Sequence, residues 1–231
     1  MTVVAPPVGR ANSAPDLALA IARVAREVAA VHADDVDREA CFPVDAIAAL
    51  KRCGAMAALV PRALGGPGAT IDEVVAHCTE LGRACASTAM IYAMHQIEVA
   101  VLVRHAAEQP LLRDYLCDLV DHQWLIASAT SEIGIGGDLR RSACALDRRG
   151  GRVCVTKQAS VMSYGDHADA ILLTARRHAD AAASDQVLLL ARREDCTLTP
   201  LSDWNALGFR GTGSRGFTVV VDTPAEYVLE T

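Results

Sequence analysis

The segment of this chain most suited to chemistry runs from residue 127 to residue 138 and reads Ala-Ser-Ala-Thr-Ser-Glu-Ile-Gly-Ile-Gly-Gly-Asp. Thr130 and Ser131 bring two hydroxyl groups to the end of a predicted strand, where they can hydrogen-bond a flat polar ring. The glycines that follow allow the backbone to come close to a ligand. The segment lacks the G-x-G-x-x-G spacing and a strand pattern follows it, which excludes a dinucleotide-binding phosphate loop. A glycine-rich hairpin without a ligand is the competing interpretation.

Other polar residues, within this segment and later in the chain, give weaker indications of a functional site. The hydroxyls at 128–131 have no acid–histidine pair spaced to activate them, which argues against a hydrolase triad. Glu132 and Asp138 flank the glycine turn, so we expect them to accept backbone hydrogen bonds rather than to act as an acid pair. Arg210 and Arg215 flank a Gly-Thr-Gly-Ser turn, where they could meet a phosphate or simply lie in solvent.

The eight cysteines include no C-x-x-C pair, which is the spacing typical of a structural zinc site, so no metal site is predicted. We expect them to be reduced and mostly buried, in a cytoplasmic protein. His77 and His95 fall in apolar helical runs and are expected in the core or at a pocket edge. The N-terminus shows no secretory signal. The apolar run 84–103 is interrupted by polar residues and predicts a buried helix, not a membrane span.

Composition narrows the classes of function. The net charge of −6 comes from 22 Lys and Arg against 28 Asp and Glu, so the chain lacks the basic excess of a nucleic-acid-binding protein. Hydrophobic residues make up 52% and charged residues 22%, which excludes disorder over most of the chain. Because aromatic residues make up only 4%, the core must consist mainly of Ala, Val, Leu and Ile. The length corresponds to about 1.5 average domains.

The first half of the chain reads as helices. Ser13 and Pro15 predict a helix start, and apolar residues follow at helical spacing as far as Val31. Thr70 and Glu73 form the capping box T-x-x-E. The other expected starts are Phe42-Pro43, Ser87 as the cap of a helix running to about His105, and Pro110.

The pattern changes near residues 121–124. Short β-rich runs then alternate with Gly, Asp and Arg turns, at residues 124–130, 152–156, 168–175, 186–191 and 217–222. Regular short strands with turn residues between them are typical of a β-barrel or sandwich. Helices followed by strands predict an α+β chain. The predicted organisation is a disordered N-terminus (1–14), a helical domain (15–122) and a β-domain (123–231).

The segment 131–138, SEIGIGGD, resembles the T-E-x-x-x-G-S-D motif of acyl-CoA dehydrogenases. Further stretches resemble that family in the same order and at compatible distances. They are Phe-Pro at 42–43, LVPRALGGPG at 59–68, ELGRACAST at 80–88, SYGDHADAILLTAR at 163–176 and LGFRGTGSRGFTVVVDTPAEYVL at 207–229. The resemblance covers the chain from about residue 15 and implies a helical domain followed by an antiparallel β-barrel. It also implies a C-terminal four-helix domain, with FAD between that domain and the barrel.

The resemblance implies five flavin-binding positions and one substrate-binding position. Ser131 would meet the pyrimidine side of the flavin, and Thr130 would be the neighbouring contact. Ser163 would lie near the N5 edge of the flavin, where it would tune hydride acceptance. The remaining positions are Gly136, where the backbone stays close to the cofactor, Val161, in place of a stacking Trp, and Gly137, in place of a Ser that contacts acyl-CoA.

The implied reaction is α,β-dehydrogenation of an acyl-CoA thioester, with hydride transfer to FAD. The family's catalytic base comes from the C-terminal domain, and this sequence ends at Glu230-Thr231, so no catalytic residue is predicted. We expect a partner chain or oligomer to supply the missing helices, and we expect an apolar face where they pack. Ile133, Gly137 and Val161 depart from the family pattern. They leave open a reduced-flavin-dependent monooxygenase of the same superfamily, or a non-catalytic interaction module. No nucleic-acid or membrane partner is expected.

Overall fold

A computed structural model of the chain describes residues 13–229 and divides them into two compact units. The helical unit contains the described residues up to Trp124 together with Asn205–Thr212. The β unit contains Leu125–Trp204 and the described residues from Gly213 onward. Helices therefore precede strands, which confirms the predicted α+β class. The expected disorder of residues 1–12 lies outside the described residues, whereas residues 13 and 14 already form the start of the first helix.

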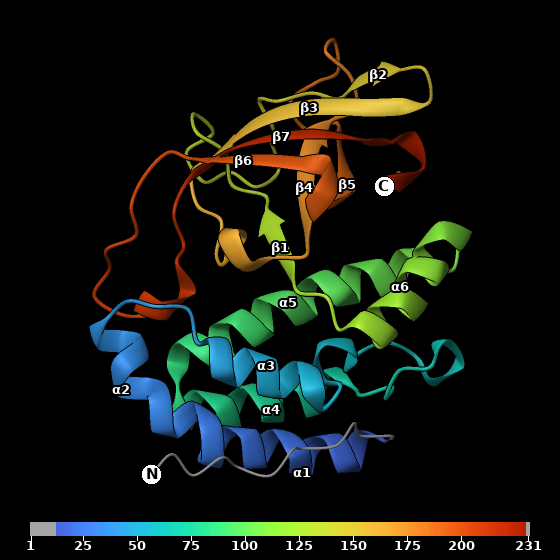
Figure 1. Cartoon of the computed structure of the whole chain (residues 1–231). Helices are drawn as coiled ribbons and strands as arrows, with labels where there is room; N and C mark the ends of the chain where they lie inside the picture. Colours follow the sequence, from blue (N-terminus) through green and yellow to red (C-terminus); the bar gives the residue numbers. More distant parts are fainter. Residues whose placement is uncertain (1–12, 230–231) are drawn as a thin grey trace. The chain divides into compact units, whose positions relative to one another are not determined.

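The described part of the helical unit contains six α-helices (Figure 1). They are α1 (Ala14–Val24), α2 (Ala30–Arg38), α3 (Val44–Arg52), α4 (Ile71–Ala84), α5 (Ala86–His105) and α6 (Pro110–His122). A π-helical turn, Ala25–Ala29, joins α1 to α2. Leu17, Ile21 and Val24 are fully buried, as expected for the apolar stripe of α1.

Two helix starts follow the local sequence pattern. The Ser13 hydroxyl accepts a hydrogen bond from the Asp16 backbone at 3.3 Å. The Thr70 hydroxyl accepts one from the Glu73 backbone at 3.2 Å, and the Glu73 carboxylate accepts one from the Thr70 backbone at 2.7 Å. The predicted capping box at the start of α4 is therefore confirmed.

The predicted cap of α5 is wrong. The N-cap is Cys85, and Ser87 lies within the first turn of the helix. The Ser87 hydroxyl instead accepts a hydrogen bond from the Gly211 backbone at 3.2 Å. A Cβ at Gly211 would lie 2.4 Å from Val36 Cγ1 and 2.7 Å from the Cys41 carbonyl oxygen, so this close approach requires glycine.

Helix α5 is a core helix with polar residues buried along it. It is the one helix in the described residues that is long and apolar enough to cross a membrane, and half of its most apolar stretch is buried. His95 Nε2 lies 2.8 Å from the Met56 carbonyl oxygen, and the Gln96 amide donates to the carbonyls of Ala55 and Met56 at 3.0 and 3.1 Å. The predicted core placement of His95 is confirmed, because the residue is fully buried.

His77 on α4 is expected to make the stability of the helical unit depend on pH. The residue is 3% exposed, and its Nδ1 lies 3.1 Å from the Tyr92 hydroxyl. Burial lowers its pKa below the usual 6.5, against a weaker opposing effect of the Glu73 charge. As the pH falls through 6.5 the unfolded chain therefore binds more protons than the folded chain. We expect the free energy of unfolding to decrease between about pH 7.5 and about pH 5.5.

Urea unfolding at several pH values tests this expectation. His77→Gln removes the titrating group and should give a shallower pH dependence than the unmodified chain. His178→Gln, at an exposed position, serves as the control and should retain the original dependence. Parallel pH profiles for the unmodified chain and His77→Gln would contradict the prediction.

The β unit contains two four-stranded sheets among its described residues. Their strands are β1 (Ile126–Ala129), β2 (Asp147–Arg149), β3 (Arg152–Ala159), β4 (Ala170–Arg176), β5 (Gln186–Arg192), β6 (Cys196–Pro200), β7 (Phe217–Pro224) and β8 (Val228–Leu229). The strand orders are β1-β4-β5-β8 and β2-β3-β7-β6. Five of the six pairings between described strands are antiparallel, and β1 runs parallel to β4.

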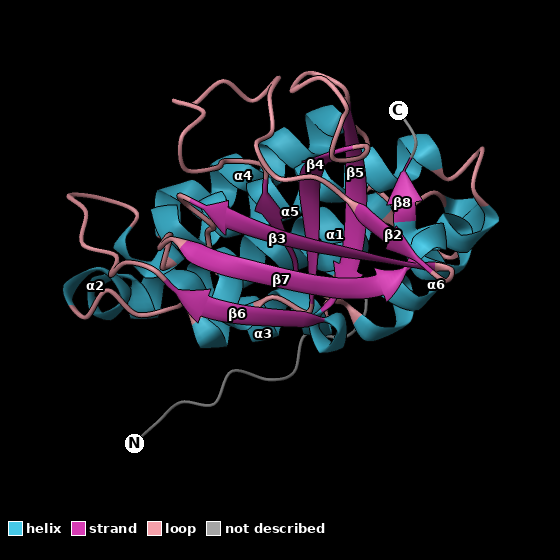
Figure 2. Ribbon diagram, turned by 90° about the horizontal axis from the view of Figure 1, so that it is seen from above, coloured by secondary structure: helices cyan, strands magenta, loops and turns pink. Residues whose placement is uncertain are grey.

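The strands of the two sheets cross at a steep angle within the β unit (Figure 2). Side chains of β3 alternate between buried and exposed, with Val153, Val155 and Ala159 on the buried face. This alternation is the pattern of a strand with one face in a sandwich core. Lys157 lies on the same face and is fully buried, so the core of this unit contains a charged side chain.

Candidate functional site

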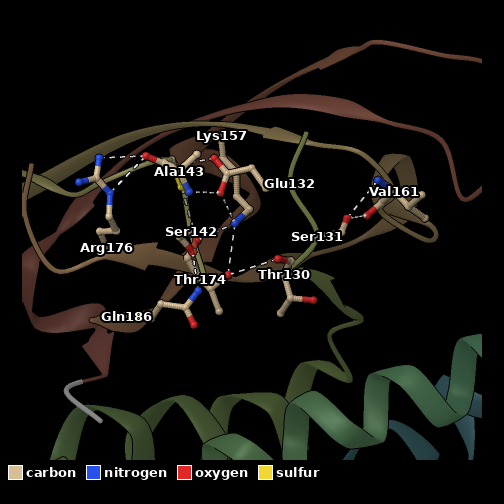
Figure 3. A network of polar contacts seen from close by, with 11 residues as sticks. Thr130, Ser131, Glu132, Ser142, Ala143, Lys157, Val161, Thr174, Arg176 and Gln186 are labelled. Carbon is tan, nitrogen blue, oxygen red and sulfur yellow. Dashed lines mark hydrogen bonds and ion pairs between the residues drawn. The ribbon is translucent and has the colours of Figure 1, made fainter. Parts of the chain in front are cut away.

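The predicted flavin-binding hydroxyls follow the end of β1 (Figure 3). Ala129 is paired with Leu173 in the parallel β1–β4 ladder, which places Thr130 beside Thr174. The Thr174 hydroxyl donates to the Thr130 carbonyl oxygen at 3.4 Å. The Thr130 hydroxyl has no hydrogen-bond partner among the described residues and is half-buried. It is therefore available to a ligand.

The structure brings Ser131 and Val161 together across 30 residues of sequence. The Ser131 hydroxyl donates to the Val161 carbonyl oxygen at 2.8 Å and accepts from the Val161 backbone N–H at 3.1 Å. A serine hydroxyl has one proton and two lone pairs, so in this conformation Ser131 can only accept one further hydrogen bond. The Val161 side chain is 46% exposed.

The glycine-rich loop between β1 and β2 is open to solvent at the predicted contact positions. Gly134, Gly136 and Gly137 have φ values of 93°, 61° and 83°, in the region that favours glycine. A Cβ at any of the three would meet nothing within 4 Å. The backbone here is thus accessible, and a side chain at Gly137 would be opposed by backbone strain, not by lack of space.

Ser163 lies apart from this loop and contacts the residues before β7. Its hydroxyl lies 2.7 Å from the Ser214 hydroxyl, and both residues are 6% exposed. Either oxygen can be the donor in this pair. When Ser214 donates, the Ser163 proton is available to another acceptor. The structure contains no direct hydrogen bond between the Ser163 side chain and Thr130 or Ser131.

A buried ion pair lies beside these residues, and its lysine is absent from the sequence-based prediction. Lys157 Nζ is 3.4 Å from Glu132 Oε2, 2.8 Å from the Thr174 carbonyl oxygen and 3.2 Å from the Thr174 hydroxyl. The Glu132 carboxylate also accepts the backbone N–H groups of Ala143 at 2.9 Å and Cys144 at 2.8 Å. The expectation that Glu132 bonds to the backbone is confirmed. Lys157 follows Val153 and Val155 at the every-second-residue spacing of a strand. This spacing was the one sequence pattern that could have predicted that its side chain points inward.

Cys144 is expected to be an unreactive thiol within this network. Its Sγ lies 3.6 Å from the Thr174 carbonyl oxygen. Burial raises its pKa to about 11, with Lys157 lowering it and Glu132 raising it more weakly. At about pH 8 such a thiol has a thiolate fraction roughly 100-fold below that of an unperturbed cysteine. Timed alkylation followed by mass spectrometry should label the exposed Cys41 well before Cys144, and equal rates would contradict the assignment.

The two arginines considered for phosphate binding both contact protein acceptors. In the β unit, Arg215 Nη2 donates to Asp166 Oδ2 at 2.5 Å. In the helical unit, Arg210 Nε donates to the Asp37 carbonyl oxygen at 2.7 Å, and its Nη1 donates to Asn205 Oδ1 at 3.2 Å. These contacts favour structural roles for both guanidinium groups.

Known proteins resemble this chain over its helical part and, more weakly, over most of its length. Residues 15–123 match the family described as the acyl-CoA dehydrogenase N-terminal domain. The cyclohex-1-ene-1-carbonyl-CoA dehydrogenase of Geobacter metallireducens is 25% identical over 208 residues, which are 89% of this chain and 54% of that protein. A probable acyl-CoA dehydrogenase of Mycobacterium leprae, fadE25, is 34% identical over 123 residues, 53% of this chain and 31% of that protein. Residues 15–123 therefore belong to the acyl-CoA dehydrogenase N-terminal domain family.

Solved structures agree with this acyl-CoA dehydrogenase-family fold. FMN-bound TdsC from Paenibacillus sp. A11-2 superposes with a TM-score of 0.82 at 20% identity, covering 93% of this chain and 54% of that one. Another structure describes the same protein as a dibenzothiophene monooxygenase. The chain therefore spans about half the length of relatives that it matches over most of its own length.

The residues after β1 fit a flat heteroaromatic ring with polar edges. The Thr130 hydroxyl is unpaired among the described residues, and the loop glycines leave their backbone uncovered. Thr130, Ser131 and Val161 lie at this strand end, and Gly136 belongs to the exposed loop that follows it. Ser163 lies two residues after Val161, and its hydroxyl forms a hydrogen bond with the Ser214 hydroxyl. Their assignment as flavin contacts, and that of Gly137 as a substrate contact, remains a prediction.

Proposed function

We propose that this chain forms the helical and β parts of a flavin-dependent oxidoreductase that dehydrogenates an acyl-CoA thioester with FAD. The observation that carries the proposal is the unpaired Thr130 hydroxyl beside an exposed glycine loop, in a chain of the acyl-CoA dehydrogenase family. The name of the Geobacter metallireducens relative, a CoA-thioester dehydrogenase, supports the same reaction class.

The residues of the chain would bind and orient the ring system. Thr130 would donate a hydrogen bond to a carbonyl of the flavin, while Ser131, held by Val161, would accept one. The loop containing Gly136 and Gly137 would let backbone groups approach the cofactor and substrate. When bound, the flavin supplies the acceptor for the substrate hydride. We assign no catalytic base to the described residues.

An apolar face of the helical unit supports the need for additional helices. Ile71 and Val75 on α4 and Ile97 on α5 are 59%, 58% and 60% exposed. They line a shallow hollow of about 480 Å³, and its other lining residues are five aliphatic side chains together with Cys78, Gln96 and Arg104. Contiguous exposed apolar surface is typical of an interface. We propose that helices from polypeptide outside these 231 residues cover this face and contribute the base.

A reduced-flavin-dependent monooxygenase is the second candidate. Gly137 carries no side chain for an acyl-CoA contact, and Val161 stands in place of the stacking Trp. TdsC, a monooxygenase solved with FMN bound, has a similar fold and supports this alternative. It requires a flavin site at the same strand end and a different substrate.

Flavin binding and bleaching separate these functions. The chain is purified alone and co-expressed with the coding sequence that directly follows its own, then titrated with FAD and FMN while the visible flavin spectrum is recorded. Loss of flavin colour on anaerobic addition of an acyl-CoA is the result expected for the dehydrogenase.

Two other outcomes would contradict the dehydrogenase. Flavin that binds but is not bleached by acyl-CoA would contradict the dehydrogenase, and transfer of one oxygen atom from O2 to an organic substrate by the reduced flavoprotein would support the monooxygenase. A protein that takes up neither flavin in either preparation would reject both enzymes and leave an interaction module. Thr130→Val, which replaces the free hydroxyl with a methyl group, should weaken flavin binding, whereas Thr197→Val on β6 should not.

A further inference from the structure

The glycine-rich loop has little apolar contact of its own to hold its shape. Residues 133–142 are mostly exposed, including Ile133 at 52% and Leu139 at 57%. Its internal backbone hydrogen bonds are short-range turns, such as Asp138 to Ile135 at 3.2 Å. Only its end residues bond to other segments through the backbone, Ile133 to the Gln158 carbonyl oxygen and Ser142 to the Ala183 carbonyl oxygen, both at 2.9 Å. A loop of this kind opens readily unless another group restrains it.

Glu132 provides such a restraint at both ends of the loop. It is the residue immediately before the loop, and its two carboxylate oxygens accept the N–H groups of Ala143 and Cys144, which lie immediately after it. One side chain thus spans the loop and closes it. Hydrogen bonds to an ionised carboxylate are among the stronger ones in proteins.

Lys157 keeps that carboxylate in place inside the β unit. Its side chain is fully buried, and the Glu132 side chain is 5% exposed. The three protons of the ammonium group have three acceptors: Glu132 Oε2 and two oxygens of Thr174. Because Thr174 also donates to the Thr130 carbonyl oxygen, the same network reaches the end of β1 (Figure 3).

We propose that Glu132 and Lys157 form a clasp that sets the conformation of loop 133–142 and thereby positions Thr130 and Ser131. The control of the loop follows from the contacts above and needs no ligand. The effect on Thr130 and Ser131 as ligand contacts rests on the proposed flavin site. Both members of the clasp are positioning residues, since neither is placed against a cofactor or substrate.

If Glu132 and Lys157 only filled space in the core, replacing both would have a different effect from the one expected of a clasp. Replacing both members of a buried ion pair with apolar side chains of similar volume is often neutral or stabilising. If the pair only fills the core, the double variant Glu132→Met with Lys157→Met should behave like the unmodified chain in every respect. If the pair is a clasp, the double variant should unfold normally but have a loosened loop.

Hydrogen–deuterium exchange of the full chain tests this difference. We expect the amides of Ala143 and Cys144 to exchange at least about tenfold faster in Glu132→Met and in the double variant. Amides of β7 should remain unchanged in the double variant, and its unfolding midpoint should stay near that of the unmodified chain. The matched control is Asp222→Met, which breaks the exposed pair with Arg152 and should leave the loop unchanged.

Two results would overturn the proposal. If the amides of Ala143 and Cys144 exchanged at the same rate in the double variant as in the unmodified chain, the pair would not hold the loop. A loosened loop with unchanged FAD affinity, where about a tenfold loss is expected, would reject the positioning of Thr130 and Ser131. A loosened loop in a chain that binds no flavin at all would reject the proposed function while leaving the clasp itself supported.

Discussion

Lys157→Met should destabilise the β unit by about 3–5 kcal/mol, because it leaves the Glu132 carboxylate buried without its cation. The side chains of this pair are 0% and 5% exposed, so solvent offers little compensation. The Thr174 carbonyl and hydroxyl would also lose their donor. Since native proteins are stable by only about 5–15 kcal/mol, the loss is a large fraction of the total. Urea unfolding, followed by a spectroscopic signal from the β unit, measures it.

Arg152→Met provides a control on the same strand. Arg152 is 46% exposed and pairs with Asp222 at 2.6 Å. Exposed pairs contribute about 0–1 kcal/mol, so this variant should remain close to the unmodified chain. Adding Glu132→Met to Lys157→Met should restore most of the lost stability. Equal losses for Lys157→Met and Arg152→Met would contradict the buried pair.

Gly66→Ala is expected to cost about 3 kcal/mol in the helical unit, at the upper end of overpacking effects. A Cβ at this position would lie 2.1 Å from the Val60 carbonyl oxygen and 2.5 Å from Val60 Cβ. Val60 is fully buried, and its carbonyl oxygen accepts the Gly68 backbone N–H at 3.0 Å. Because backbone atoms make this contact, no rotation of a side chain can relieve the clash.

The matched control for this glycine is Gly208→Ala, also in the helical unit. A Cβ at Gly208 meets nothing within 4 Å, and its φ lies outside the glycine-favouring region. Its unfolding free energy should therefore change by less than about 0.5 kcal/mol. Chemical denaturation of both variants decides the matter, and a Gly66→Ala chain as stable as Gly208→Ala would contradict the close packing of the loop.

The sequence predicted the features that depend on neighbouring residues. The capping box of Thr70 and Glu73 could be predicted because both partners lie within one helical turn. The five strand runs and the α+β order followed from hydrophobic periodicity. Strand β2 was missed because its three residues are polar and exposed, and β6 was missed because its alternation of apolar and polar residues extends over only five residues.

Local reasoning failed where the partner was distant in sequence. Ser87 was expected to cap its own helix, but its hydroxyl bonds to Gly211, 124 residues later. Ser131 was expected to hydrogen-bond a flat polar ring, and its own proton is directed to the Val161 carbonyl oxygen. No pattern within a few residues contains these contacts.

The sequence by itself determined the family, the order of helices and strands, and the glycine-rich segment with its hydroxyls. These depend on composition, periodicity and short motifs, which are properties of neighbouring residues. Only the tertiary structure decided which hydroxyl is free, which is engaged, and that Lys157 meets Glu132 across 25 residues. The physical reason is that a buried polar group must find a partner, and the fold selects that partner from segments remote in the chain.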